Sequence, residues 1–490
     1  MQLSINPVRQ SNKLVVVSNR AGYVFSGEEG QFSAGRAVSG LVSAVEPVLN
    51  SSSGTWVAWC GRLGGEAERG ITLAVPQDAP RYTIREVILE EEEYRKYYHG
   101  FANSCLWPLA HQMIEKCEFK KEYWLAYRKV NRKFARAALS CGRADTLFWV
   151  HDYHLTLVPQ IIRRHLPEAR IAFFWHIPFP PAEAFSVLPW GRQVLHGLLG
   201  SDLVAFHTKS YLENFLACLK KDFRLKVQAE TGTIWTGSRW ITARALPVGI
   251  NWQRFEQLAE DPEVRARARR IREAIGAEYL LLGIDRLDYT KGIAERIKAF
   301  GAFLKKYPQY QGKATLLQIA VPTRNGVEAY DRLKKEVERL VGEINGLYDR
   351  GYGAVPVRYL HRSLSEKELV AHYLAADVLL VTALRDGLNL IAKEFVAARA
   401  DGQGMLILSP FAGAADEMKS ALLANPYDTA QLVNKMKLAV EMPAGEKTKR
   451  IRELRQIVKN RDSRWWWQTH LKLISLPHGT AAPDKIIAAN

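Results

Sequence analysis

The sequence predicts an α/β protein made of two doubly wound, Rossmann-like domains. Short, fully apolar runs recur along the chain, as buried parallel strands require. Amphipathic stretches of about 10–20 residues separate these runs, and such alternation is typical of βαβ units. The length agrees, because 490 residues at about 100–200 per domain make two or three domains.

The apolar runs form two groups, one in each half of the chain. Those of the first half are residues 14–17, 147–150, 171–175 and 203–206. Those of the second half are residues 280–284, 316–321, 378–381 and 405–408. Each group is large enough to supply the parallel strands of one sheet.

Helix patterns lie between these runs. After Gly35 the apolar residues of 38–45 have the spacing of one helix face, and Pro47 is expected to end that helix. The segment 33–36 is expected to be a loop that opens the helix and offers N–H groups to an anion. A similar apolar pattern follows Gly387.

The domain boundary is expected within residues 247–261, where strand-like 244–248 gives way to a charged helix over 262–275. We therefore predict an N-terminal domain over 1–250 and a C-terminal domain over 251–462. A last helix is predicted over 463–476, and 477–490 is expected to be a frayed tail. The tryptophans at 465–467 fit packing in a core or between domains, with a stacking platform for bases as the alternative.

The net charge of +17, from 68 Lys and Arg against 51 Asp and Glu, favours phosphate-bearing partners. Nucleic acid is disfavoured, since the chain has no zinc-finger spacing, no RNP-like motif and no long basic tract. A dinucleotide oxidoreductase is disfavoured, since no G-x-G-x-x-G follows the first apolar run.

The five cysteines include no C-x-x-C pair, which favours a reducing compartment over a disulfide framework. The first ten residues have no apolar core typical of a signal peptide. No run of 18 apolar residues predicts a membrane span. We expect a cytoplasmic protein without a membrane partner.

Polar residues follow the apolar runs at the strand ends where open α/β sheets bind ligands. Arg20 follows the first run, and Asp152 follows the run at 147–150. In the second half Arg286, Lys291 and Arg324 hold comparable positions. Facing domains would enclose a cleft lined by these cations, which suits phosphorylated ligands.

His151, Asp152 and His154 could also be read as metal ligands. No third and fourth ligand stands at a recognisable spacing, so we expect neither a metal site nor a cofactor. A carboxylate that accepts hydrogen bonds from sugar hydroxyls is the preferred interpretation of Asp152.

A set of longer motifs resembles the trehalose-6-phosphate synthases, retaining glycosyltransferases of the GT-B fold. The resemblance covers about residues 13–475. The motifs that carry it are VVVSNR (15–20), YYHGFANSCLWP (97–108), WVHDYHL (149–155), HIPFP (176–180), RLDYTKG (286–292), INGLYDRGYG (344–353), LRDGLNLIAKE (384–394) and SPFAGAADE (409–417).

The resemblance implies an acceptor-binding N-terminal domain, a nucleotide-sugar-binding C-terminal domain, and a last helix that crosses back to the N-terminal domain. On the acceptor side it implies that Arg20 and Arg324 hold the phosphate of glucose 6-phosphate. Tyr98, Trp107 and Asp152 would surround that acceptor.

On the donor side the resemblance implies that Arg286 and Lys291 grip the diphosphate, near Gly35 and Arg36. Glu394 would bind the ribose, and Leu364 would lie at the nucleotide base. The donor sugar and phosphates would be held by Asp386, Gly387, Leu388, Asn389 and Leu390. By the same resemblance the catalytic residues would be His176, Arg286, Lys291 and Asp386.

The implied reaction transfers glucose from a nucleotide-glucose, first of all UDP-glucose, to glucose 6-phosphate without a metal. The expected partners are these two substrates and further copies of the chain in a dimer or tetramer. Two departures leave the donor nucleotide and the acceptor open: Gly35-Arg36 replaces the usual pair of glycines, and Trp175 replaces a smaller apolar residue. A glucosylglycerol-phosphate synthase and a non-catalytic regulatory homologue remain alternatives.

Overall fold

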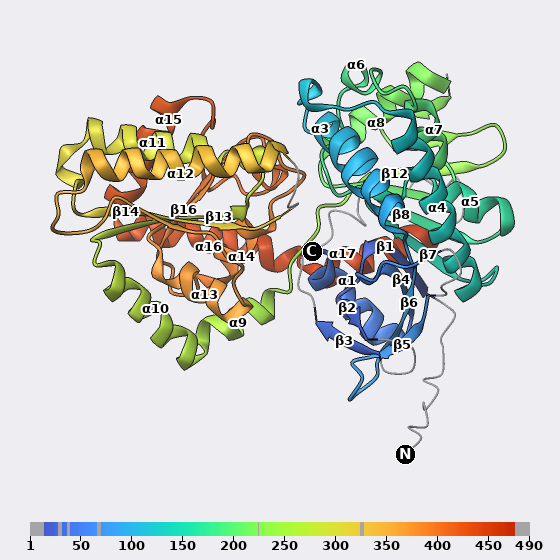
Figure 1. The fold of residues 1–490 in the computed structure, drawn as a ribbon, viewed down its shortest axis with the longest axis horizontal. Coiled ribbons are helices and arrows are strands. Elements are labelled where there is room, and N and C mark those ends of the chain that lie inside the picture. Colours follow the sequence, from blue (N-terminus) through green and yellow to red (C-terminus); the bar gives the residue numbers. More distant parts are fainter. Residues whose placement is uncertain are drawn as a thin grey trace. The chain divides into compact units, whose positions relative to one another are not determined.

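The computed structural model describes residues 14–27, 32–36, 40–65, 70–223, 225–323 and 328–475 (Figure 1). The chain divides into two compact units. Unit 1 takes its described residues from Met1–Val248 and Ser463–Asn490, and unit 2 takes them from Gly249–Asp462.

Unit 2 contains a six-stranded sheet in the order β15-β14-β13-β16-β17-β18, in which every neighbouring pair is parallel. In chain order this is 3-2-1-4-5-6, the strand order of a Rossmann fold. The strands are β13 (Tyr279–Arg286), β14 (Ala314–Val321), β15 (Val357–Leu360), β16 (Val378–Val381), β17 (Met405–Leu408) and β18 (Leu422–Leu423).

The strands of unit 2 are joined and covered by α-helices and short 3₁₀ turns. The α-helices are α9 (Trp252–Glu260), α10 (Pro262–Ile275), α11 (Ile293–Lys306), α12 (Glu328–Tyr348), α13 (Glu366–Ala375), α14 (Leu390–Ala398), α15 (Thr429–Glu441) and α16 (Ala444–Asn460). The 3₁₀ turns are η4 (Tyr289–Lys291), η5 (Pro308–Tyr310) and η6 (Gly413–Asp416).

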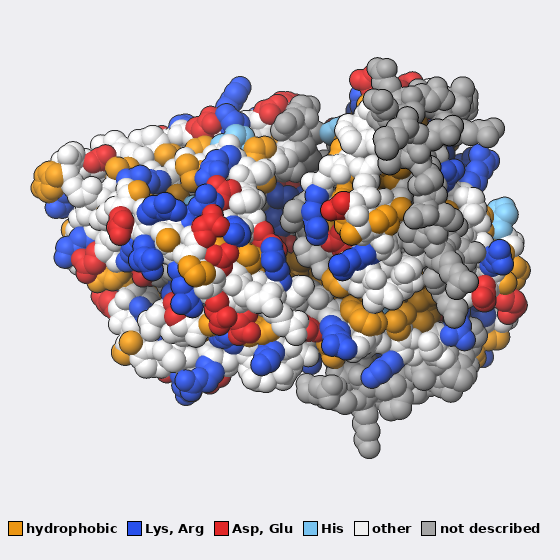
Figure 2. All heavy atoms as spheres, turned by 90° about the horizontal axis from the view of Figure 1, so that it is seen from below, with side chains coloured by type: hydrophobic (Ala, Val, Ile, Leu, Met, Phe, Trp, Pro, Cys, Tyr) orange, Lys and Arg blue, Asp and Glu red, His pale blue; other side chains and the backbone are white. Residues whose placement is uncertain are grey.

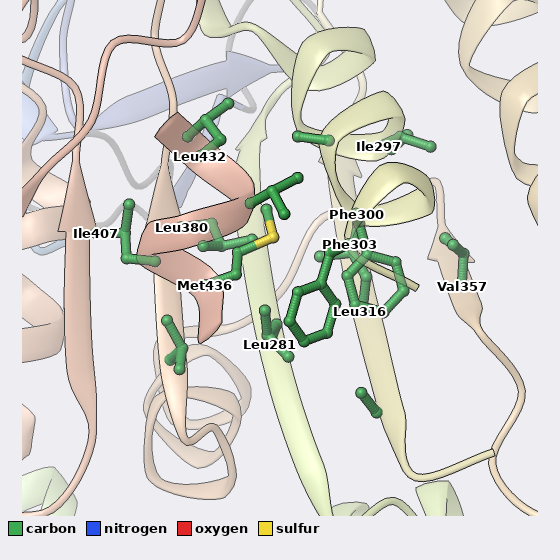
Figure 3. Packing of buried hydrophobic residues seen from close by; sticks show 14 of the residues in the cluster. Leu281, Ile297, Phe300, Phe303, Leu316, Val357, Leu380, Ile407, Leu432 and Met436 are labelled. Carbon is green, nitrogen blue, oxygen red and sulfur yellow. The ribbon is translucent and has the colours of Figure 1, made fainter. Parts of the chain in front are cut away.

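The core of unit 2 forms where α11 and α15 lie over the sheet. Figure 3 shows Phe300 and Phe303 of α11 together with Met436 of α15, packed with Leu281 of β13 and Leu316 of β14. All five side chains are fully buried or nearly so. Because helices cover the strands, their side chains are apolar on both faces, and this explains the uninterrupted apolar runs of the sequence.

Unit 1 contains a ten-stranded sheet in the order β10-β11-β12-β9-β8-β7-β1-β4-β6-β5. Its seven central strands are parallel, and β5, β10 and β11 are antiparallel additions at the edges. The strands are β1 (Leu14–Arg20), β4 (Thr55–Trp59), β5 (Thr72–Val75), β6 (Tyr82–Glu86), β7 (Leu147–His151), β8 (Arg170–Phe174), β9 (Leu203–Phe206), β10 (Lys226–Gln228), β11 (Thr233–Trp235) and β12 (Trp240–Ala245).

The remaining elements of unit 1 are a hairpin, a set of helices and a long π-helix. The hairpin pairs β2 (Tyr23–Ser26) with β3 (Ser33–Arg36). The helices are α1 (Gly40–Ser52), α2 (Glu91–Tyr94), α3 (Trp107–Ala110), α4 (Lys121–Cys141), α5 (Val158–His165), α6 (Ala182–Phe185), α7 (Gly191–Leu198), α8 (Lys209–Phe223) and α17 (Ser463–Ser475), with the π-helix η1 (Arg95–Leu106) and the 3₁₀ turns η2 (Ile114–Lys116) and η3 (Tyr153–Leu155).

These two sheets confirm the predicted class of two Rossmann-like, doubly wound units. Every apolar run that was expected to be a strand lies in a strand, except that β8 ends one residue before Trp175. The expected strand over 244–248 is wrong in its bounds, because β12 ends at Ala245.

Two local predictions near the N-terminus are wrong. Residues 33–36 are not a loop that opens a helix but the strand β3, in which Gly35 pairs with Val24 across the hairpin. Pro47 does not end the following helix, because α1 runs on to Ser52. Val48 and Leu49 beyond the proline are buried, and their packing offsets the roughly 3 kcal/mol that an internal proline costs a helix.

Helix α17 belongs to unit 1, although unit 2 precedes it in the sequence (Figure 1). It packs against α1 and β8. Trp466 is fully buried and lies 4.9 Å from Trp149 and 5.2 Å from Phe174 between ring centroids. The central tryptophan of the 465–467 run is thus a core residue of unit 1.

We predict that Trp466→Ala lowers the free energy of unfolding by about 3–5 kcal/mol, because it leaves a cavity against Trp149 and Phe174. Arg464→Ala, two residues before it on the exposed side of α17, is the matched control and should change stability by less than about 0.5 kcal/mol. Urea titration followed by circular dichroism measures both. An equal effect of the two substitutions would contradict this packing role.

Candidate functional site

In both units the strand order reverses between two neighbouring parallel strands, and the polar residues singled out from the sequence follow those strands. In unit 2 the reversal lies between β13 and β16, and in unit 1 between β1 and β7. Arg286 ends β13 and Arg20 ends β1, while Asp386 follows β16 and Asp152 follows β7. Crevices at such reversals are where open α/β sheets bind ligands.

The polar residues of unit 2 centre on a short network around Asp386. Lys291 Nζ lies 2.6 Å from Asp386 Oδ2, and Asn389 Nδ2 donates to the same oxygen at 3.1 Å. The Lys291 side chain is only 8% exposed. One carboxylate therefore holds its ammonium in place. The side chain loses little conformational entropy when an anion binds.

The turn that carries Lys291 is held by Asp288, whose Oδ1 accepts from Thr290 N at 3.0 Å and from Thr290 Oγ1 at 2.9 Å. Leu384 N donates to Thr290 O at 2.8 Å, which ties this turn to the segment before Asp386. Gly292 has φ +63°, and a Cβ there would lie 2.1 Å from Thr382 O. Only glycine allows this close approach of the two segments.

Below this turn lies a buried charge that sequence reasoning missed. Arg296 of α11 is fully buried and donates to Asp285 Oδ2 at 2.6 Å, Gln318 Oε1 at 2.8 Å and Thr382 Oγ1 at 3.0 Å. These partners belong to β13, β14 and the segment after β16. The arginine thereby joins the strands on both sides of the reversal. A basic residue inside an otherwise apolar helix face was the available signal.

The residues 386–390 form the loop that leads into α14. Asn389 has φ +79°, and its Oδ1 accepts from Ala392 N at 3.2 Å as the helix cap. Ala414 N donates to Leu388 O at 2.9 Å, and Gly413 N donates to Asp386 O at 3.2 Å, so the segment 413–414 supports the loop. Gly387 is buried, and Leu390 is the first residue of the helix. The N-terminus of α14, beside Lys291, attracts negative charge.

Glu394 lies one turn further along α14, where its Oε2 accepts a hydrogen bond from Tyr373 Oη at 2.9 Å. Burial, and to a smaller degree the charge of Glu366, raises the pKa of Glu394 to about 7, against the hydrogen bond from Tyr373. Leu364 is half-buried in the segment between β15 and α13. Both residues belong to unit 2.

In unit 1 an aromatic group surrounds the end of β1. The Arg20 guanidinium lies 4.5 Å from the ring centroid of Trp59 and 5.8 Å from that of Tyr98, and it donates to Tyr94 Oη at 3.3 Å. Arg20 is itself exposed. Cation–π contacts thus orient this guanidinium and leave it accessible to an anion.

Tyr98 and Trp107 come from the π-helix η1 and the helix α3 that follows it. Tyr98 stacks on Tyr94 at 5.1 Å and on His154 at 5.7 Å between ring centroids. Trp107 is buried and lies 5.9 Å from Tyr153. The 12-residue π-helix is a feature that no sequence pattern predicted, and long π-helices are rare.

Asp152 has φ +76°, which is uncommon for a residue with a side chain. Its Oδ1 accepts from Tyr153 N at 2.9 Å and from His176 N at 3.3 Å, and Oδ2 lies 3.6 Å from His154 Nδ1. Burial alone would raise the pKa of Asp152, but His154 and the backbone N–H of Tyr153 hold that pKa below its ordinary value. The carboxylate is therefore ionised and held in a defined position.

His176 is half-buried and lies next to the buried His151. Its Nε2 is 3.1 Å from His151 Nδ1. His470 packs nearby against Trp466 and Phe174. Burial lowers the pKa of His176 to about 4, and it lowers the pKa of His470 to about 4 as well. At neutral pH both rings are uncharged.

Arg36 does not lie free at a helix start. Its guanidinium donates to Glu46 Oε2 of α1 at 2.7 Å, and Glu46 Oε1 accepts from Tyr82 Oη at 3.1 Å. The Arg36 side chain is 61% exposed. Gly35 is an exposed residue of β3. Arg324, the second predicted phosphate ligand, lies outside the described residues.

Within each unit some of the predicted residues form a connected group. In unit 1 contacts lead from Arg20 through Tyr98 and His154 to Asp152 and His176. In unit 2 they lead from Lys291 through Asp386 to Asn389. Among the described residues no group of three or more His, Cys, Asp or Glu side chains could hold a metal ion.

Two Rossmann-like units, each with polar residues at its strand reversal, are the architecture of the GT-B glycosyltransferases. The model of glycosyltransferase family 20 matches residues 12–475, and the chain belongs to this family.

Relatives agree with that assignment. The chain is 39% identical to a trehalose-6-phosphate synthase of Mycolicibacterium smegmatis, over 90% of this chain and 88% of that protein. It is also 39% identical to a bifunctional trehalose-6-phosphate synthase/phosphatase of Thermoproteus tenax, over 97% of this chain. It spans only 65% of that bifunctional protein's length.

Two solved structures are similar over 95% of this chain and 100% of theirs. One, from E. coli and bound with UDP-2-fluoro glucose, is 32% identical with a TM-score of 0.87. The other is an α,α-trehalose-phosphate synthase (UDP-forming) from Burkholderia xenovorans in complex with glucose 6-phosphate, 30% identical with a TM-score of 0.87.

In the described part of the chain, no helix is both long and apolar enough to cross a membrane. On the face that Figure 2 shows, the Lys and Arg side chains of unit 2 lie interspersed with Asp and Glu.

We predict that the protein loses stability as the pH falls from about 6.5 to about 4. The unfolded chain protonates His176 and His470 near their ordinary pKa of 6.5, whereas the folded protein protonates them only near 4. Each histidine then costs up to about 3 kcal/mol of unfolding free energy at the acid end of this range. Urea unfolding at several pH values measures the slope.

The variant His470→Gln should show a shallower dependence on pH over this range, because it removes one of the two groups. His165→Gln is the matched control, since His165 is exposed at the end of α5. An H470Q slope equal to that of the wild type would show that the acid sensitivity arises elsewhere.

Proposed function

We propose that this chain transfers glucose from a nucleotide-glucose, UDP-glucose first among them, to the anomeric hydroxyl of glucose 6-phosphate. The products are trehalose 6-phosphate and a nucleoside diphosphate. The observation that carries the proposal is the Lys291–Asp386–Asn389 network at the strand reversal of unit 2, in a member of glycosyltransferase family 20. The bound sugars of the E. coli and Burkholderia xenovorans structures support both substrate classes.

Unit 2 binds the donor in this proposal. Lys291 and Arg286 meet the diphosphate, together with the N-terminus of α14. Asp386 and the loop 387–390 hold the sugar and phosphates, Glu394 accepts from the ribose, and Leu364 lies at the base. Positive charge fixed before the reaction is most effective where negative charge grows, which here is the leaving diphosphate.

Unit 1 binds the acceptor. Arg20 takes the phosphate of glucose 6-phosphate, with Arg324 as its proposed second ligand. Asp152 accepts hydrogen bonds from sugar hydroxyls, while Tyr98 and Trp107 give the pocket its apolar walls. The exposed guanidinium of Arg20, oriented on Trp59, supports this role.

The reaction retains the configuration of the glucose. The acceptor oxygen forms its bond to the anomeric carbon on the face from which the diphosphate departs. The acceptor proton passes to the leaving phosphate oxygen. His176, neutral at pH 7, has Nε2 at His151 and can offer its other ring nitrogen to a hydroxyl of the reacting sugar.

Two further expectations belong to the proposal. The family resemblance suggests a dimer or tetramer, and sedimentation equilibrium gives the mass that decides it. A cytoplasmic, reducing location is supported by the five cysteines, all of which are free thiols, with Cys60, Cys105 and Cys218 buried.

One assay tests the function: purified protein with UDP-, ADP- and GDP-glucose as donors and glucose 6-phosphate or glycerol 3-phosphate as acceptors, with the products identified by mass and NMR. Trehalose 6-phosphate as the main product supports the proposal. Glucosylglycerol phosphate as the main product, or no transfer with any pair, would refute it. Activity should persist in EDTA, because Arg286 and Lys291 supply the positive charge.

We predict that Arg20→Ala raises the KM for glucose 6-phosphate roughly tenfold or more, because a charged hydrogen bond to the phosphate contributes about 1.5–3 kcal/mol. The KM for the donor should change little. Arg170→Ala is the matched control, since Arg170 is exposed at the amino end of β8, on the edge of the same sheet opposite to Arg20. Unchanged acceptor kinetics in the Arg20 variant would remove this residue from the phosphate site.

We predict that Lys291→Ala lowers kcat/KM on the order of 10²-fold or more, through kcat as well as donor binding, because the ammonium stabilises charge that grows in the transition state. Lys313→Ala is the matched control: Lys313 is exposed and precedes β14 at the amino edge of the sheet. A loss confined to donor KM would assign Lys291 to ground-state binding alone.

A further inference from the structure

A cationic cavity lies among the helices of unit 1, apart from the residues assigned to substrates. It has a volume of about 630 Å³, which is within the range of small-molecule sites. Its lining comes from α4, the residue before α5, α5, α7 and the end of α8: Trp124, Arg128, Arg132, Leu157, Gln160, Ile161, Arg164, Arg192, Gln193, His196, Gly197 and Phe223. We call it the arginine pocket.

The lining includes four arginines and a histidine but no Asp or Glu. In the part of the chain that the structure describes, Arg128, Arg132, Arg164 and Arg192 form no hydrogen bond and no ion pair. Arg163, the neighbour of Arg164 on α5, differs: it binds both carboxylate oxygens of Asp202 at 2.7 Å. The positive charge of the pocket is thus not neutralised by the protein.

The spacing of the basic residues in the arginine pocket places like charges close together, which lowers the stability of their helices. Arg128 and Arg132 stand four residues apart on α4, and like charges at that spacing destabilise a helix by a few tenths of a kcal/mol. Arg192 and His196 have the same spacing on α7. Besides its burial, the charges of Arg164 and Arg192 lower the pKa of His196, which places all three groups close together.

Two contacts give the pocket a defined shape. The Arg192 guanidinium lies 5.0 Å from the ring centroid of Phe223, which orients it. A Cβ at Gly197 would lie 2.3 Å from Thr156 O, so glycine lets α7 approach the segment before α5 closely. This approach brings arginines of separate helices to one cavity.

We propose that the arginine pocket binds a small molecule with two or more phosphate groups. Guanidinium groups bind phosphate oxygens in pairs, and four unpaired ones call for more charge than one phosphate carries. The concave shape favours a small molecule over a nucleic-acid strand, which needs an extended surface. None of the residues assigned to donor or acceptor lines the pocket, so the proposal does not depend on the proposed function.

The test is calorimetric titration of the full-length protein with inorganic triphosphate, pyrophosphate and monophosphate. Every arm carries Lys291→Ala, which weakens binding of such anions at the candidate donor site. Adding the substitutions R128Q/R164Q to this background should reduce triphosphate affinity at least about tenfold. In the protein that keeps all four pocket arginines, higher salt should weaken triphosphate binding. The pair R132Q/R192Q repeats the test with the other two arginines.

The matched control is R81Q/R270Q, which removes two exposed arginines outside the pocket and so changes the net charge equally. It should leave triphosphate affinity unchanged. In otherwise wild-type protein, R128Q/R164Q should leave the KM values of both substrates unchanged. Thermal unfolding checks that each variant is folded.

Several outcomes would overturn the proposal. Equal losses in R128Q/R164Q and R81Q/R270Q would mean non-specific attraction. Equal affinity for monophosphate and triphosphate would refute the requirement for two phosphates. Absence of triphosphate binding would show that the pocket is an empty cavity. A changed sedimentation coefficient in R128Q/R164Q would show that it is a protein interface. A changed substrate KM in that variant would make it a part of the substrate site.

Discussion

The functional organisation of this protein depends on one constraint, the reversal of strand order in each parallel sheet. Where neighbouring parallel strands send their following segments to opposite faces, the sheet cannot close the space between those segments. In unit 2 this happens between β13 and β16, and in unit 1 between β1 and β7. The polar side chains of the candidate site lie there because the apolar strands end at this point and give way to loops.

Buried charges stabilise the reversal in unit 2 only because each is paired. Arg296 is fully buried and binds Asp285, Gln318 and Thr382, and the removal of any partner would leave a charge or a polar group unsatisfied. Gly283 of β13 belongs to the same arrangement, since a Cβ there would lie 2.3 Å from Arg296 Nη1. The Lys291–Asp386 pair lies next to this network and shares its order. These hydrogen bonds and ion pairs hold Lys291 and Asp386 in defined positions.

Unit 1 uses aromatic rings where unit 2 uses ion pairs. Arg20 lies on Trp59 and Tyr98, and Asp152 is held by backbone N–H groups and His154. His176 and the buried His470, both neutral at pH 7, continue from this group toward α17. The candidate acceptor half therefore combines an exposed cation and a fixed carboxylate, while the arginine pocket of the same unit places its charge among the covering helices.

The sequence by itself determined the strands and the fold class, because a short apolar run between amphipathic helical stretches is typical of a buried parallel strand. It also placed Arg20, Asp152, Arg286, Lys291 and Asp386 at strand ends, since that follows from position along the chain. The π-helix at 95–106, the strand at 33–36 and the continuation of α1 past Pro47 were decided by tertiary packing, which outweighs local propensity. The Arg296 network and the arginine pocket could not be predicted from the sequence. The residues that form each of them lie on segments far apart in the chain and meet only when the helices pack on the sheet.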